Sequence, residues 1–183
     1  MKYRCAATLP IAVCLATGSL TAQASPRQDG PVIQSAGAVF VVTEPDFETP
    51  TDMIYRVAFE VAQAAPSSEE LNPGLNTVAR FLNMHAQAGV PLDQLQVAVV
   101  VHGPAGKDLL DDSAYRDRLG SDNPNTRLLH ELAAAGVELI LCGQTAASRG
   151  LPWDGLAEPV TVALSAMTAL AVLQERGYHV NPF

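Results

Sequence analysis

The sequence predicts an α/β protein, a three-layer α/β/α sandwich whose strands are joined by right-handed crossovers. Three observations lead to this prediction. Short apolar runs rich in valine and isoleucine, typical of strands buried on both faces of a parallel sheet, alternate with segments of helical periodicity. Several helical segments have a recognisable start or stop residue. The chain has 183 residues, which is long enough for one domain with its own core.

The first 24 residues are typical of a secretory signal peptide. Lys2 and Arg4 precede an apolar run over residues 6–20, and the sequence AQA at 22–24 fits a cleavage site. The run is too short for a membrane anchor, so we expect no membrane association. We therefore expect a mature chain that begins at Ser25 and is located in a bacterial periplasm.

Four apolar runs are predicted to form strands. Residues 25–37, which precede them, are polar and rich in glycine and proline, and predict a flexible leader. The domain itself is expected over residues 38–183. In chain order the predicted strands are AVFVVT (38–43), QVAVVV (96–101), VELILC (137–142) and PVTVAL (159–164).

Helical patterns lie between the predicted strands. The first begins at Thr49, an N-cap followed by proline, and its apolar face is formed by Met53, Ile54, Val57, Ala58 and Val61. The others have a glycine after their last residue, which is a common helix stop. They are predicted over about residues 74–88, over 125–136 with Asn125 as the cap, and over about 166–176.

The charge balance and the cysteines limit the possible partners and chemistry. The chain has 19 acidic and 11 basic residues and no basic cluster, which argues against binding to nucleic acid or anionic membranes. Cys142 is the single thiol that would remain after signal cleavage, because Cys5 and Cys14 lie in the first 24 residues. It cannot form a disulfide within the mature chain. The Cys142 thiol is therefore either buried and inert, paired in a disulfide between two chains, or a reactive group.

Two chemically capable residues fall where predicted strands end, the position at which parallel sheets bind ligands. His102 directly follows one strand and Cys142 ends the next. The segment GQTAASRG after Cys142 predicts a turn into a short helix, whose N–H groups would favour a thiolate. We therefore predict a Cys142 pKa below the free value of about 8.5, although burial would oppose this. The alternative is that Cys142 packs as a small hydrophobic residue.

Other residues are candidates for binding around these two. His102 could act as a general base or orient a ligand, or its ring could simply bond loop backbone. Asn123 could face the crevice, although helix-cap chemistry also explains it. The remaining candidates are the backbone N–H groups of Gly143, Gln144 and Thr145, and Arg149, which we expect to reach back toward the sulfur.

No motif predicts a metal or a cofactor. His85, His130 and His179 lack metal-ligand spacing. The segment VHGPAGKD fails as a phosphate loop, because its glycines are too close together and its lysine is followed by aspartate. No dinucleotide fingerprint, nucleophile elbow or CxxC pair is present. We expect neither a metal site nor a cofactor.

The chain resembles the DsrE/DsrF-like family over about residues 38–183. Three stretches carry the resemblance, namely VAVVVHGPA, NPNTRLLHELAAAGVELILCGQTA and LSAMTALAVLQERGYHVNPF. The segment around the cysteine is similar to that of the sulfur-relay subunits DsrE and TusD. Cys142, Ala146, Arg149 and Gly150 stand in the shared spacing C-x-x-x-A-x-x-R-G.

The resemblance implies a mainly parallel five-stranded sheet, a trimeric or hexameric homo-oligomer, and, in the relay members, a persulfide on the cysteine. We therefore expect a periplasmic persulfide carrier or sulfurtransferase-type relay protein that uses Cys142 and His102. Its partner would be a sulfur donor or acceptor protein or a small thiol. The relay members are cytoplasmic, and the CGQ segment resembles exported members whose role is not established. The alternative is a non-catalytic binding or assembly module whose cysteine is structural.

Overall fold

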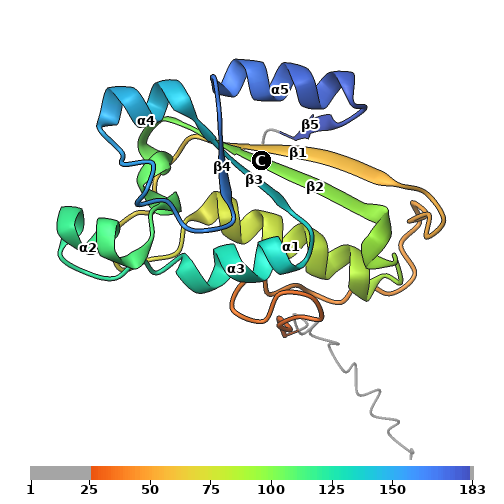
Figure 1. Cartoon of the computed structure of the whole chain (residues 1–183). Helices are drawn as coiled ribbons and strands as arrows, with labels where there is room; N and C mark the ends of the chain where they lie inside the picture. Colours follow the sequence, from red (N-terminus) through yellow and green to blue (C-terminus); the bar gives the residue numbers. More distant parts are fainter. Residues whose placement is uncertain (1–25, 182–183) are drawn as a thin grey trace, which may run out of the picture.

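A computed structural model describes residues 26–181, in which five parallel strands form one sheet with the order β4-β3-β2-β1-β5 (Figure 1). The predicted three-layer α/β/α class and the five-stranded sheet are confirmed. Because neighbouring strands are parallel, their carboxyl ends meet along the same edge of the sheet. The strands are β1 Tyr55–Val61, β2 Leu95–Val101, β3 Glu138–Cys142, β4 Val160–Ala163 and β5 His179–Asn181.

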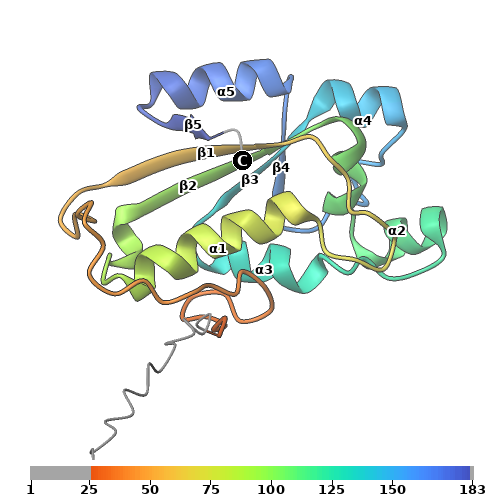
Figure 2. The ribbon, with the colours of Figure 1, turned by 180° about the vertical axis from the view of Figure 1, so that it is seen from behind.

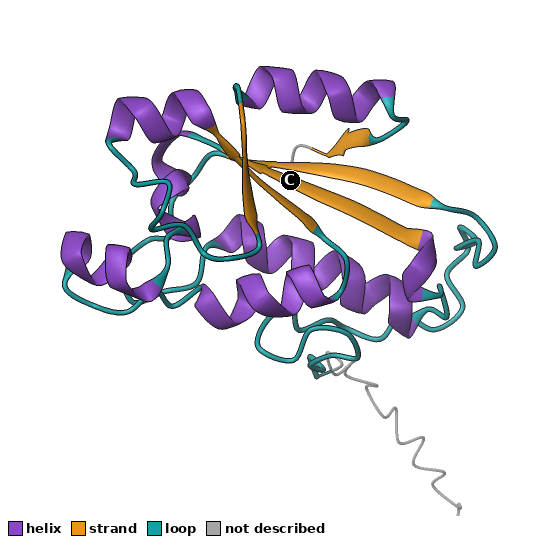
Figure 3. Ribbon diagram, in the orientation of Figure 1, coloured by secondary structure: helices purple, strands orange, loops and turns teal. Residues whose placement is uncertain are grey.

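Helices cover both faces of this sheet, as Figures 2 and 3 show. Helices α1 (Pro73–Gln87) and α3 (Thr126–Ala134) lie on one face, and α5 (Ala166–Glu175) lies on the other. Short helices follow two of the strands, η2 (Gly103–Leu109) one residue after β2 and α4 (Gly143–Arg149) directly after β3. The remaining elements are η1 (Leu92–Gln94) and α2 (Asp112–Leu119).

Strand β2 shows why continuous apolar runs mark this sheet. Val97, Val99 and Val101 pack in the core cluster formed with α1 and α3, whereas Ala98 and Val100 pack in the cluster under α5. Side chains of a strand alternate between the two faces, so a strand covered on both sides needs apolar residues at every position. The sequence predictions of strands 96–101, 137–142 and 159–164 are confirmed as β2, β3 and β4.

The predicted helices over 74–88, 125–136 and 166–176 are confirmed as α1, α3 and α5. Asn72 caps α1, because its Oδ1 accepts hydrogen bonds from the N–H groups of Gly74 and Leu75 at 2.8 and 3.2 Å. Asn125 stands at the start of α3, but its side chain does not bond to that helix. Its Oδ1 accepts from the Asn72 N–H at 2.8 Å and so joins the starts of α1 and α3.

The prediction of a helix over residues 49–61 is wrong, because residues 55–61 form strand β1. Val57, Ala58 and Val61 can share a helix face, but the segment YRVAFEV is also rich in the β-branched and aromatic residues that strands favour. In the sheet, Phe59 and Val61 face the α1 side and Ala58 faces α5. Burial on both faces therefore removes the alternation that would have marked a strand.

The predicted strand over residues 38–43 is also wrong. Within this segment only Val39 makes a β-bridge, to Gln28, and Val42 is 70% exposed. The short edge strand β5 and the helices α2 and η2 were not anticipated by the sequence patterns, since their apolar runs are too short to show a period.

Residues 30–37, which their composition predicts to be part of a flexible leader, instead pack against α1 and α3. Ile33 is fully buried, and its N–H donates to Asn83 Oδ1 at 2.8 Å. The carboxylate of Glu131 accepts hydrogen bonds from the N–H groups of Gln34 and Ser35, both at 3.0 Å. The buried Asn83 of α1 and the partly exposed Glu131 of α3 therefore anchor this segment to the domain.

The predicted signal peptide, residues 1–24, lies outside the described residues. Cys5 and Cys14 belong to it, so Cys142 is the cysteine that the structure describes. Within residues 26–181, no helix has both the length and the hydropathy required to cross a membrane.

Candidate functional site

Cys142 is the last residue of β3 and directly precedes α4. It pairs with Ala163 of β4 on one side. On the other side the register pairs Val101 with Leu141, so His102 follows β2 at the level where Cys142 ends β3. The structure therefore brings the two predicted catalytic residues to neighbouring strand ends, on the edge where parallel sheets bind ligands.

The sulfur of Cys142 receives hydrogen bonds from the starts of two helices. Burial alone raises the pKa of Cys142, but the Thr145 hydroxyl and the N–H groups of Thr145, Ala166 and Gln144 together lower it below the ordinary value. Gln144 and Thr145 lie in the first turn of α4, and Ala166 is the first residue of α5. Such N–H groups have no partner within their own helix, so they are free to bind an anion. The predicted lowering of the pKa is confirmed in direction.

We expect the rate of Cys142 alkylation by iodoacetamide to have a pH midpoint below the free-thiol value of about 8.5. The reason is that four hydrogen bonds to the sulfur outweigh burial. Replacing Thr145 by valine removes the hydroxyl but keeps the N–H, so it should raise the midpoint. Rates measured across pH on both proteins test this. A wild-type midpoint above that of a free thiol would show that burial dominates.

The same lowering makes folding stability depend on pH. A thiol whose pKa is lower in the folded than in the unfolded chain adds stability that is fully present above the unfolded-state pKa. That stability is lost as the pH falls through the folded-state pKa. Relative to a Cys142→Ala variant, the wild-type protein should therefore become more stable as the pH rises toward about 8.5.

Gly143 and Thr145 place the thiol by close packing. A Cβ atom on Gly143 would lie 2.6 Å from the carbonyl oxygen of Ala163, so only glycine fits between α4 and β4. Thr145 Oγ1 accepts a hydrogen bond from the N–H of Gly103 at 2.9 Å. Gly103 has a φ of +58°, which favours glycine. Thr145 thus links the cysteine segment to the turn after His102.

His102 forms a pair with Glu60, a residue that sequence reasoning missed. The distance from His102 Nε2 to Glu60 Oε1 is 2.9 Å, and both side chains are partly exposed. Glu60 alternates with Ala58, which faces α5, so Glu60 shares the sheet face of Cys142. Glu60 is the only acidic residue in the apolar segment YRVAFEV. Because the sequence pattern predicts a helix there, it does not place Glu60 beside His102.

Arg149 and Asn123 are not part of this site. Arg149 is exposed at the last residue of α4, about 10 Å along the helix from its start, so it does not reach back to the sulfur. Asn123 is buried, and its Nδ2 donates to the carbonyl oxygens of Asp108 and Leu110 at 3.0 and 2.6 Å. It therefore fixes a loop and does not face a crevice. Gln144 contributes its N–H, while its side chain is exposed.

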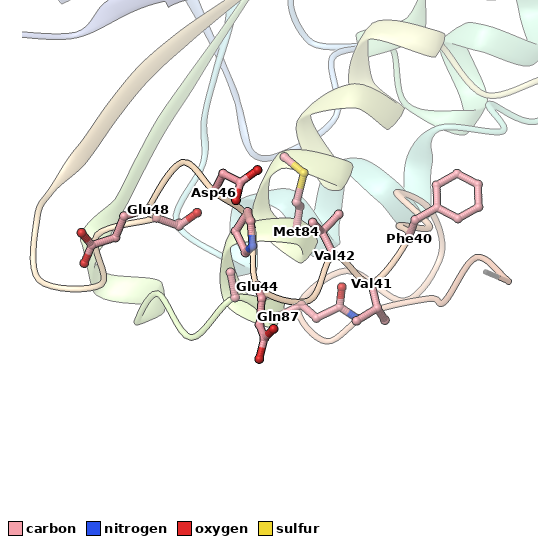
Figure 4. Close-up of a pocket in the computed structure, with 11 residues that line it drawn as sticks. Phe40, Val41, Val42, Glu44, Asp46, Glu48, Met84 and Gln87 are labelled. Carbon is pink, nitrogen blue, oxygen red and sulfur yellow. The ribbon is translucent and has the colours of Figure 1, made fainter. Parts of the chain in front are cut away.

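A surface pocket of about 590 Å³ lies elsewhere in the molecule (Figure 4). It is lined by apolar and acidic residues of the segment 40–49 and by Met84, Gln87 and Ala88 at the end of α1. Pockets of this size are common ligand sites, but no cysteine or histidine lines this one. Among the described residues, no group of three or more histidine, cysteine or acidic side chains could hold a metal ion. Cys142 is therefore the candidate nucleophile that we consider further, at the carboxyl end of β3.

Solved structures of similar fold were found, whereas no curated protein of similar sequence was found. MTH1491, a protein of unknown function from Methanobacterium thermoautotrophicum, superposes with a TM-score of 0.53 at 19% sequence identity. The match covers 70% of this chain and 99% of the MTH1491 chain. The YchN protein from E. coli superposes with a TM-score of 0.53 at 18% sequence identity, and the match covers 71% of this chain and 100% of the YchN chain. At these identities the likeness concerns the fold. The sequence pattern of the DsrE/DsrF-like family matches residues 38–182, and the chain belongs to this family.

Proposed function

We propose that this DsrE/DsrF-like protein is a periplasmic sulfur carrier that holds sulfane sulfur as a persulfide on Cys142. The observation that carries the proposal is the place of Cys142 at the carboxyl end of β3, between the starts of α4 and α5. Polar groups of Thr145, Ala166 and Gln144 there lower the pKa of the thiol against the effect of burial. The thiolate is the form that attacks sulfur, and a lowered pKa increases its share. Its partner would be a sulfur donor or acceptor protein, or a small thiol.

The transfer balances without a redox partner. The Cys142 thiolate attacks the outer sulfur of a donor persulfide, R–S–SH. A new S–S bond forms at Cys142, the S–S bond of the donor breaks, and the bonding electron pair leaves with R–S⁻. The reverse sequence passes the sulfur to an acceptor thiolate.

Mass spectrometry tests the proposal directly. After incubation with glutathione persulfide, the intact protein should gain the mass of one sulfur atom, and peptide mapping should locate it at Cys142. Treatment with dithiothreitol should remove it. An unmodified Cys142 that also resists alkylation in the folded protein would contradict the proposal.

A second candidate function is a non-catalytic binding or assembly module. The observation that favours it is the burial of Cys142, which is 5% exposed. A buried cysteine often serves as a small hydrophobic residue, and Ala98, Ala166 and Ala169 pack in the same cluster. The Cys142→Ser variant separates the two functions.

We also propose that the protein is a homo-oligomer, and we favour a trimer over a dimer. Leu164 and Met167, at the junction of β4 and α5, are 73% and 79% exposed, and exposed apolar groups of this kind are typical of interfaces. Light scattering at micromolar concentration should show a mass above that of one chain. Replacing Met167 by glutamate should lower it, whereas a monomeric wild-type protein would contradict the prediction.

A further inference from the structure

An acid–histidine pair lies beside Cys142 without contributing to the hydrogen bonds of its sulfur. His102 Nε2 and Glu60 Oε1 are 2.9 Å apart, with side chains 28% and 39% exposed. The donors to the sulfur come instead from α4 and α5. The pair is therefore not needed to activate the thiol, and solvent or a ligand can reach it.

The sheet places this pair next to the sulfur. The β4 side of Cys142 is occupied by Ala163, its strand partner, and by Ala166, which donates its N–H. On the opposite side is β2, where His102 continues the strand in extended conformation, with φ −149° and ψ −179°. Side chains alternate along a strand, so His102 lies on the same sheet face as Ala98 and Val100. This is the face covered by α5, and Cys142 also lies on it. Adjacent strands are about 4.8 Å apart.

The hydrogen bond to Glu60 fixes how the imidazole can act. With Nε2 turned to the carboxylate, Nδ1 is the nitrogen left for a ligand, and among the described residues it has no hydrogen-bond partner. A carboxylate that holds one ring nitrogen sets the orientation and the tautomer of a histidine. When the ring carries a proton on each nitrogen, the Nδ1 proton is the one that can pass to a molecule bound at Cys142.

We propose that His102 donates a proton to the thiolate R–S⁻ that leaves when Cys142 attacks a donor persulfide. Glu60 is the positioning residue that holds the His102 ring. This inference rests on the proposed function. The balanced step is Cys142–S⁻ + R–S–SH + His102–H⁺ → Cys142–S–SH + R–SH + His102. The proton thus ends on the departing thiol, which would otherwise leave as an anion with a conjugate-acid pKa of about 8.5.

The pair also selects a substrate class. Persulfides of small thiols or of protein cysteines release a basic thiolate, which a proton donor stabilises. Thiosulfate releases sulfite, a stable anion that needs no proton to depart. Glu60 and His102 therefore assist sulfur transfer from persulfide donors and leave transfer from thiosulfate unaffected.

Rates of Cys142 loading from glutathione persulfide and from thiosulfate test this inference on the full protein. His102→Gln should slow loading from the persulfide about 100-fold, and Glu60→Gln about 10-fold, while loading from thiosulfate stays unchanged. The double variant should be no slower than His102→Gln, because Glu60 acts through His102. Glu69→Gln, an exposed acid outside the site, is the matched control and should behave as wild type.

Different failures have different meanings. If Glu60→Gln slows both donors equally, or neither, or adds its full effect to His102→Gln, the inference is overturned and the carrier function stands. If neither donor loads the wild-type protein, the proposed function is overturned and this inference with it. The alkylation rate of Cys142 should be the same in Glu60→Gln and wild type, which shows that the thiol site itself is intact.

Discussion

Replacing Cys142 by serine should abolish sulfur loading, with a loss of at least about a thousand-fold, while the fold is retained. A serine hydroxyl is close in size to a thiol and can accept the same hydrogen bonds from α4 and α5. It remains protonated at neutral pH, however, so no nucleophile is left to attack a sulfane sulfur. Intact-mass measurement after exposure to glutathione persulfide should therefore show no added sulfur.

The control for this experiment is Thr145→Ser, which keeps the hydroxyl that bonds to the sulfur. It should load sulfur, and both variants should give the circular dichroism spectrum of the wild-type protein. If the Cys142→Ser variant binds its ligands or supports its cellular role unchanged, the cysteine is structural. The non-catalytic module would then be the better description.

The positions of Cys142 and His102 could be predicted from the sequence because two features were unambiguous there. Strands β2 and β3 are buried on both faces and read as continuous apolar runs. The carboxyl ends of neighbouring parallel strands share one edge, so residues that follow such runs converge. Gly143 and Thr145 followed from the same short segment.

The remaining contacts of the site depend on strand order, which no local pattern contains. Ala166 reaches the sulfur because β4 lies beside β3 and α5 starts where β4 ends. Glu60 reaches His102 because β1 lies beside β2. Both are long-range pairings. The helix length alone, by contrast, already placed Arg149 two turns away from the cysteine.

The run 38–43, which is exposed from Phe40 onward, shows the opposite limit. Its composition favours a strand, yet within this run only Val39 makes a β-bridge, to Gln28. The segment instead follows residues 30–37, which Asn83 and Glu131 anchor over α1 and α3. β-propensity records how well a residue fits a sheet surface, and it does not form a strand in a segment that other contacts hold away from the sheet.

Replacing Asp108 by alanine should lower the free energy of unfolding by about 3–5 kcal/mol. Asp108 is fully buried, and its carboxylate accepts hydrogen bonds from the Ala65 N–H at 2.9 Å and from Asn72 Nδ2 at 2.6 Å, and it pairs with Lys107. Alanine would leave the N–H donors buried without this acceptor, and each unsatisfied group costs about 1–3 kcal/mol. Urea denaturation followed by circular dichroism measures the loss.

The matched control is Asp117→Ala, an exposed acid on α2, which should change stability by no more than about 0.5 kcal/mol. An Asp108→Asn variant separates charge from shape, because the amide keeps one acceptor but adds a donor where only donors lie around it. It should therefore fall between wild type and alanine. A loss below about 1 kcal/mol for alanine would mean that water replaces the carboxylate. Asp108 lies in η2, which starts directly after His102, so the same buried pairing fixes the segment that follows the histidine.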